Sequence, residues 1–148
     1  MKINNSFSAT LHILLHMEQV DKPLTSEQMA DFIDGNPAFI RKLLAGLREN
    51  KIVCATKGHN GGWRLCRPAN EVTLHDIYLA LGSPTLFAIG NRNEHPECLV
   101  EQGVNRVMSS TLADAQSLIL ARFKSLTLQD VGTEFISYFN EKGHHHDS

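Results

Sequence analysis

The chain has 148 residues, of which 42% are hydrophobic and 20% are charged, and its net charge is −2. This length suits one domain, and the composition is that of an ordinary globular protein, which excludes the disordered and fibrous classes. No apolar stretch reaches the roughly 20 residues of a membrane helix, and no cleavage site follows the N-terminal apolar residues, so a cytoplasmic protein with no membrane partner is expected.

The three cysteines are Cys54, Cys66 and Cys98, without a CxxC pair. This usage argues against a disulfide framework and a zinc knuckle, so reduced thiols are expected. Cys54 and Cys66 are most simply small packing residues, since a disulfide between them would need facing positions that the sequence does not establish. The histidine-rich segment 143–148 is expected to be a disordered tail.

Charge is distributed unevenly along the chain. Between positions 36 and 67 there are seven basic residues against one acidic residue, whereas from position 76 onward nine acidic residues face five basic ones. Such asymmetry is typical of a phosphate-binding face attached to a remainder that does not bind phosphate.

Three helices are predicted in the first third of the chain. Apolar residues at helical spacing predict a helix over 6–19, and a capping-box pattern at Thr25 begins a short second helix. Gly35 then closes that helix, Asn36 can cap a third, and Pro37 suits its first position.

The third helix is predicted to reach about residue 50 and to have two faces. Its inward residues follow the i, i+3, i+4, i+7 spacing and are Ile40, Leu43, Leu44 and Leu47. The residues left outside are Ala38, Arg41, Lys42, Ala45 and Arg48.

A hairpin follows, with β-forming runs over 52–56 and 63–66 joined by a glycine-rich turn. Trp63 is expected to pack at its base. A capping pattern at Thr73 begins a fourth helix, and the segment 82–97 has no clear period and is expected to be a long loop.

Two further helices are predicted, one over 103–124 and one that Thr127 caps. The first carries a heptad-like stripe, which favours a two-fold dimer helix over a helix packed only on its own domain. The stripe consists of Met108, Leu112, Ala115 and Ile119.

The predicted fold is therefore mainly α with a small β-hairpin wing. A winged helix-turn-helix domain is expected over 1–82, a sensor-type loop over 83–102 and dimerisation helices over 103–142. In a helix-turn-helix the second helix of the motif enters the major groove, so double-stranded DNA is the expected partner. A merely solvated charged face is the alternative for that helix taken alone. The candidate DNA contacts are Ser26, Asn36, Ala38, Phe39, Arg41, Lys42, Arg48, Lys57, His59, Asn60 and Arg64.

Several stretches carry a family resemblance: MKIN at the start, LTSEQMADFIDGNPAFIRKLLAGLRENKIV, the wing motif KGHNGGWRLCRP, and EVTLHDIYLAL. The chain resembles the Rrf2 family of winged-helix regulators, the group with IscR-like and NsrR-like repressors. The resemblance implies a homodimer built around the long helix that binds a palindromic promoter site, usually as a repressor.

The sensor departs from this family pattern. Cluster-binding members carry three cysteines in the loop before the dimer helix, whereas this loop has Cys98 alone, and an iron–sulfur cluster needs about four ligands. No cofactor and no metal are therefore expected, and the alternative is a non-standard cluster completed by His12, His16, His95 or Glu97. Cys98 is instead a candidate redox thiol, with an inert thiol as the alternative.

The sequence leaves two other function classes as alternatives. A protein-interaction module could use the acidic C-terminal half as its docking face. An enzyme is not expected, because Cys98 and His95 lack a glycine-framed nucleophile turn and an obvious third partner.

Overall fold

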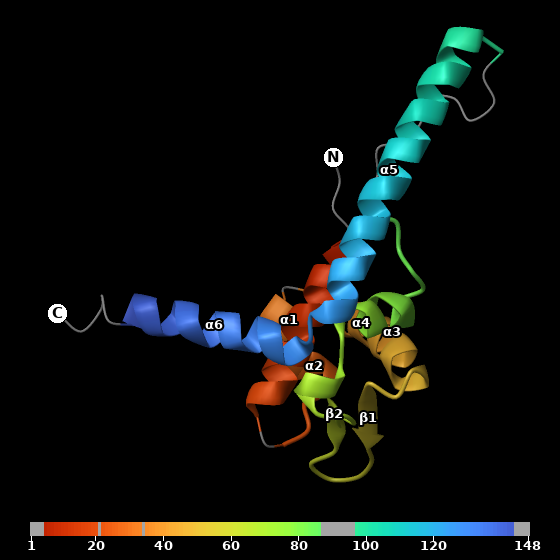
Figure 1. The fold of residues 1–148 in the computed structure, drawn as a ribbon. Coiled ribbons are helices and arrows are strands. Elements are labelled where there is room, and N and C mark those ends of the chain that lie inside the picture. The colour runs from red at the N-terminus through yellow and green to blue at the C-terminus, as the bar shows by residue number, and fades with distance from the viewer. Residues whose placement is uncertain (1–4, 21, 34, 87–96, 144–148) are drawn as a thin grey trace.

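The computed structural model describes residues 5–20, 22–33, 35–86 and 97–143. Its elements are α1 (Asn5–Gln19), α2 (Ser26–Ile33), α3 (Pro37–Glu49), β1 (Val53–Thr56), β2 (Gly62–Leu65), the 3-10 turn η1 (Ala69–Glu71), α4 (Leu74–Ala80), α5 (Leu99–Ser125) and α6 (Leu128–Gly143). Three helices, a two-stranded antiparallel hairpin and further helices make a winged helix-turn-helix (Figure 1), which confirms the predicted fold class.

Local caps fix where the helices begin. The Thr25 hydroxyl accepts a hydrogen bond from the Gln28 N–H at 3.1 Å, and the Gln28 amide oxygen accepts one from the Thr25 N–H at 2.9 Å. Reciprocal pairs of the same kind begin α4 at Thr73 and α6 at Thr127. Because the first N–H groups of a helix have no partner within it, these side chains determine the helix starts locally.

One hydrophobic core contains residues of α1, α2, α3 and α4 and of the start of α6. Its fully buried members include Ile13, Leu14, Met29, Ile40, Leu44, Leu47, Ile52, Ile77 and Leu128. The rings of Phe7, Tyr78 and Phe123 meet beside it, with Phe7 stacked on Phe123 at a centroid distance of 5.2 Å. This aromatic cluster joins α1, α4 and α5.

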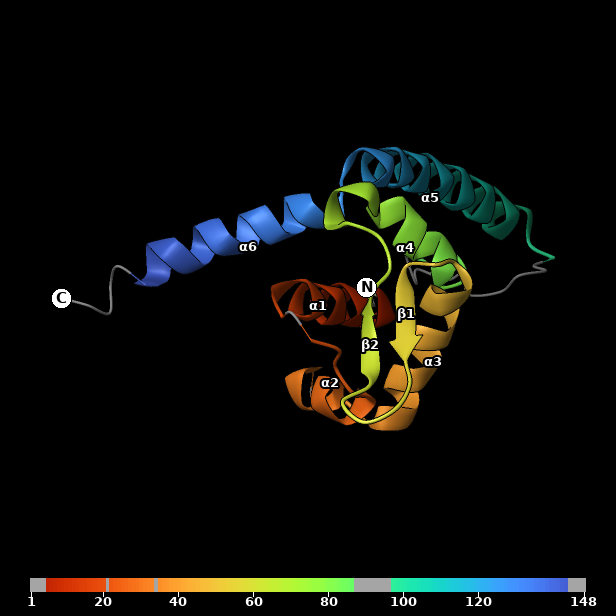
Figure 2. The ribbon, with the colours of Figure 1, turned by 90° about the horizontal axis from the view of Figure 1, so that it is seen from below.

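The corner between α5 and α6 is anchored by the backbone. The Leu74 N–H donates to the Leu126 carbonyl at 2.9 Å, and the Leu128 N–H donates to the Val72 carbonyl at 2.8 Å. From this corner α5 and α6 leave the domain in different directions (Figures 1 and 2). None of the described helices is both long and apolar enough to cross a membrane.

Helix α5 begins at Leu99, earlier than the predicted start at 103. The residues 99–102 contain no helix breaker, and Gly103 lies inside the helix rather than before it. Part of the predicted sensor-type loop and of the predicted tail, residues 87–96 and 144–148, lies outside the described residues.

The wing is tied to the body through its second strand. Within the hairpin the register pairs Val53 with Leu65. On the other edge of β2, the Leu24 N–H donates to the Trp63 carbonyl at 2.9 Å and the Trp63 N–H donates to the Leu24 carbonyl at 2.8 Å. A Cβ at Gly62 would lie 2.6 Å from the Leu24 carbonyl oxygen, so only glycine permits this close approach.

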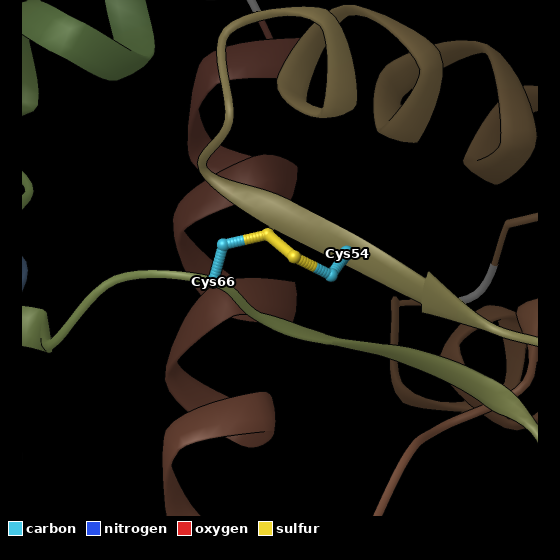
Figure 3. Close-up of a disulfide and its surroundings, with 2 residues drawn as sticks. All are labelled: Cys54 and Cys66. Atoms are coloured by element: carbon cyan, nitrogen blue, oxygen red, sulfur yellow. A yellow bond between two sulfur atoms is a disulfide. The ribbon is translucent and has the colours of Figure 1, made fainter.

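Cys54 and Cys66 form a disulfide across the wing root (Figure 3), so the expectation of reduced thiols at these two positions is wrong. The register places Cys54 opposite Arg64, and the Cys66 N–H donates to the Ile52 carbonyl at 2.9 Å. The cysteines therefore occupy diagonal positions on one face of the hairpin. Their Cα atoms are 5.3 Å apart, a separation that a disulfide spans.

Gly46 is a position where local propensity and packing oppose each other. Alanine is worth about 1 kcal/mol over glycine inside a helix, yet a Cβ at Gly46 would lie 2.6 Å from the backbone oxygen of Ala80. We expect Gly46→Ala to lower the free energy of unfolding by about 1–3 kcal/mol in urea titrations, because the α3–α4 contact must open. Gly103→Ala is the matched control, since nothing lies within 4 Å of its Cβ and it should raise stability by about 0.5–1 kcal/mol. Equal stabilisation by both changes would contradict the close α3–α4 contact.

Candidate nucleic-acid interface

Helix α3 presents a basic face because its apolar face is used in the core. Ile40, Leu43, Leu44 and Leu47 are buried. The opposite positions, as predicted, are exposed: Ala38, Arg41, Lys42, Ala45 and Arg48. The helix thus offers cationic and small side chains to a partner.

The start of α3 is fixed by a cap. Asn36 is the N-cap, and its side-chain oxygen accepts a hydrogen bond from the Phe39 N–H at 2.8 Å. Pro37 occupies the first helical position. Of the two roles considered for Asn36, base contact and helix cap, the structure supplies the cap, and this cap orients the first turn of the helix.

Two grooves flank the exposed face of α3. On one side Phe39 and Lys42 line a groove of about 490 Å³ together with the turn after α4. On the other side Ala45 and Arg48 line a groove of about 390 Å³ together with Trp63 of the wing. The second groove makes the exposed face of α3 continuous with the wing root.

The wing tip projects from the end of the molecule where α2 and α3 lie (Figures 1 and 2). Lys57, His59 and Asn60 of the tip are exposed, as is Arg64 on β2. Gly58 and Asn60 have φ values of 100° and 66°, and such left-handed residues reverse the chain in a tight turn. The tip therefore carries polar and basic side chains on a narrow projection.

Ser26 does not join this surface. It is only 7% exposed at the start of α2, because the first turn of that helix packs onto the domain. Its hydroxyl therefore offers little surface to a phosphate group.

The residues of the predicted dimer stripe on α5 differ in how far they are exposed. Met108 is 36% exposed, whereas Leu112, Ala115 and Ile119 are half-buried within the protomer. A neighbouring stripe on the same helix is more exposed and was missed because single apolar residues separated by polar ones resemble ordinary surface positions. It consists of Val100, Val104, Val107 and Leu118, with Leu118 75% exposed.

Cys98 is the N-cap residue of α5, and its thiol is free and exposed. Its side chain makes no capping hydrogen bond. Its reaction with oxidants stays a prediction, and the nearby His95 lies outside the described residues.

The described residues do not fit an iron–sulfur cluster. Within them no three His, Cys, Asp or Glu side chains lie together as a metal site, and Cys54 and Cys66 are bonded to each other. His12 and His16 do meet, with 3.1 Å between their Nε2 atoms. The pKa of His16 is lowered from its usual value, mainly by burial and to a smaller extent by the neighbouring His12. Two imidazoles fall short of the thiolate set that a cluster requires.

The fold and this surface define a winged-helix protein of the DNA-binding class. A family model described as Rrf2, iron-dependent transcriptional regulator, matches residues 3–134, and the chain belongs to this family. The members of this family and the curated relative named below are assigned as transcriptional regulators, a class of proteins that are not enzymes.

Individual relatives and solved structures are similar to this chain. YwnA of Bacillus subtilis, provisionally assigned as a helix-turn-helix-type transcriptional regulator, is 27% identical over 130 residues, covering 87% of this chain and 96% of YwnA. The fold of a regulator from Lactobacillus plantarum superimposes with a TM-score of 0.71 at 21% identity, covering 95% of this chain and 96% of the other. IscR of T. potens gives a TM-score of 0.66 at 17% identity, covering 90% and 88%.

Proposed function

We propose that this transcriptional regulator is a homodimeric repressor that binds a palindromic promoter site with α3 in the major groove and the wing beside it. One observation carries the proposal: exposed basic side chains lie both on α3 and on the wing, and Arg48 of α3 and Trp63 of the wing line one groove, with Glu49 as its acidic member. Basic side chains on two neighbouring elements suit the phosphate backbone, whose neutralisation supplies most of the non-specific affinity.

Within this surface the side chains have different tasks. Arg41 lies in the first half of α3, where a recognition helix meets base edges, and its fork of donors matches guanine. Ala38 and Phe39 are suited to a thymine methyl group. Lys42, Arg48, Lys57, His59, Asn60 and Arg64 are assigned to backbone contacts, which position the protein without reading sequence.

The homodimer is supported by the uncovered stripe on α5. Val100, Val104 and Val107 recur at steps of four and three residues, the spacing of a coiled-coil seam. A second copy of the chain would cover this stripe symmetrically and present two α3 helices. Two-fold symmetry then calls for inverted half-sites about one helical turn apart, or a multiple of it.

Cys98 is proposed as the thiol through which oxidation alters this assembly. It lies at the start of the helix that carries the dimer stripe, and it is exposed. Oxidation there would change polarity at the end of the proposed seam.

Arg41→Ala should weaken binding to the selected site by about 1–3 kcal/mol and relax specificity at one base pair. Lys57→Ala should weaken binding to all sequences and reduce the slope of log K against log salt by about 1, because one phosphate contact is lost. Fluorescence anisotropy over a salt series measures both effects. Arg106→Gln, on the projecting half of α5, is the charge-matched control and should alter neither. Unchanged salt slopes for Lys57→Ala together with unchanged affinity for Arg41→Ala would refute the proposed interface.

Val107→Asp should dissociate the dimer. Val107 is 65% exposed in the protomer, so burying the rest of it twice across a two-fold seam is worth about 2–4 kcal/mol, which is about thirtyfold or more in the dimer dissociation constant. Analytical ultracentrifugation measures this constant, and circular dichroism checks that the monomer is folded. Ser109→Asp, an exposed position on the opposite side of α5, is the control and should stay dimeric. Dissociation by the control alone would show that the seam lies elsewhere.

Cys98→Ser should leave DNA affinity intact and abolish the response of DNA binding to hydrogen peroxide. The comparison is a gel-shift titration of both proteins before and after oxidant, with Cys54 and Cys66 retained in each. An equal oxidant response in the two proteins would remove Cys98 from the switch.

A further inference from the structure

A groove of about 490 Å³ lies beside the wing root, between the end of α1 and β2. Cys66, one end of the disulfide, is among its lining residues. Three basic residues line it as well, Lys22, Arg64 and Arg67, against one acidic residue, Glu18. The lining therefore carries excess positive charge next to a disulfide.

Arg67 is incompletely satisfied in this setting. Its Nε atom is buried and has no hydrogen-bond partner among the described residues. Its guanidinium is 3.7 Å from the Asp76 carboxylate, which is longer than a hydrogen bond. Because Nε is buried, an anion in the groove can meet only the exposed part of the guanidinium, and the Arg67 side chain is 34% exposed.

We propose that this groove binds low-molecular-weight thiols that carry a carboxylate, and that the bound thiol exchanges with the Cys54–Cys66 disulfide. The basic residues would hold the carboxylate and raise the local concentration of the thiolate. The inference goes beyond DNA binding and does not depend on it, because the exchange is measured on the protein alone.

The exchange balances without another reactant. A bound thiolate RS⁻ attacks the Cys66 sulfur, the Cys54–Cys66 bond breaks, and Cys54 leaves as a thiolate while an R–S–S–Cys66 mixed disulfide forms. A second RS⁻ attacks the R sulfur, which releases RSSR and the Cys66 thiolate. Two electrons pass from two thiols to the protein disulfide, and the two protons of those thiols end on Cys54 and Cys66. The low-molecular-weight disulfide RSSR drives the reverse reaction.

The position of this bond gives the exchange a structural consequence. The covalent loop that the disulfide closes contains the whole wing tip, including Lys57, His59 and Asn60. Reduction leaves the tip held by the strand ladder and the Leu24–Trp63 bridge. The ratio of low-molecular-weight thiol to its disulfide would thus determine whether the wing tip is covalently closed.

The test compares three thiols of different charge on Cys98→Ser protein, in which the remaining cysteines are Cys54 and Cys66. The probes are 3-mercaptopropionate, 2-mercaptoethanol and cysteamine, which are anionic, neutral and cationic beside the sulfur. Opening of the disulfide is followed by alkylation and mass spectrometry, and rates are divided by thiolate concentration and corrected for thiol basicity. We expect 3-mercaptopropionate to exceed cysteamine by about tenfold at low salt, since two exposed cations, Lys22 and Arg64, and the half-buried Arg67 each contribute modestly. Equal rates, the opposite order, or free Cys54 and Cys66 thiols in air-oxidised protein would overturn the proposal.

Two controls assign the preference to the groove. Lys22→Gln combined with Arg67→Gln should bring the three rates together, whereas Lys124→Gln, which does not line the groove, should leave the preference intact. Raising the salt on the protein with the groove unchanged should also bring the rates together, and this arm needs no groove variant to fold. A preference that survives both treatments would overturn the groove as its source.

A trapping experiment tests which sulfur faces the groove. In the Cys98→Ser background, Cys54→Ser leaves Cys66 and Cys66→Ser leaves Cys54, and each is incubated with glutathione disulfide. We expect the mixed disulfide to form several-fold faster at Cys66, the residue that lines the groove. Faster trapping at Cys54 would overturn the proposed direction of attack.

Discussion

The packing of α3 against the core is the constraint on which the remaining structure depends. Ile40, Leu44 and Leu47 are fully buried, and each contributes about 1.5–3 kcal/mol of hydrophobic free energy. Because these side chains fix the rotation of the helix about its axis, they also fix which residues face outward. Arg41 and Arg48 are exposed for this reason, and not because of any interaction of their own. The exposed basic face of α3 is therefore a consequence of how its apolar face packs in the core.

The wing depends on a different kind of constraint. A two-stranded hairpin is marginal by itself in water, and its short ladder buries little apolar surface. Here the Leu24–Trp63 bridge pairs the second edge of β2, and Val53 is buried at the start of β1. The disulfide between Cys54 and Cys66 adds a covalent tie at the same root. The root is therefore held by the bridge, by the burial of Val53 and by the disulfide, while the tip with Lys57 and Asn60 stays exposed.

Much of this could be predicted from local sequence, because local chemistry sets it. The caps at Thr25, Thr73 and Thr127 and the turn at Gly35 and Asn36 act over three or four residues, and the structure contains the helices that they predict. The winged fold follows from the order of these elements. The failures concern contacts between distant segments: the disulfide depends on strand register, and the burial of Ser26 depends on how α2 packs. Both cysteines face one side of the hairpin once the turn is placed, so the register was the missing information.

The two halves of helix α5 differ in how they are held by the protomer. Its C-terminal half is held by Phe123 against Phe7 and Tyr78, and the corner beyond it is pinned by Leu128 in the core. Its N-terminal half projects with Val104 and Val107 exposed, whereas helices in proteins gain most of their stability from tertiary packing.

The two halves belong to one helix, so whatever orients the projecting half also orients the held half. The held half packs on α4, whose last residue Ala80 meets Gly46 of α3 without room for a side chain. Close-packed contacts of this kind do not deform gradually. The direction of α3 is consequently set relative to the uncovered stripe on α5, which is the geometric requirement of the proposed homodimer, because its two α3 helices would have to match the fixed pitch of a duplex.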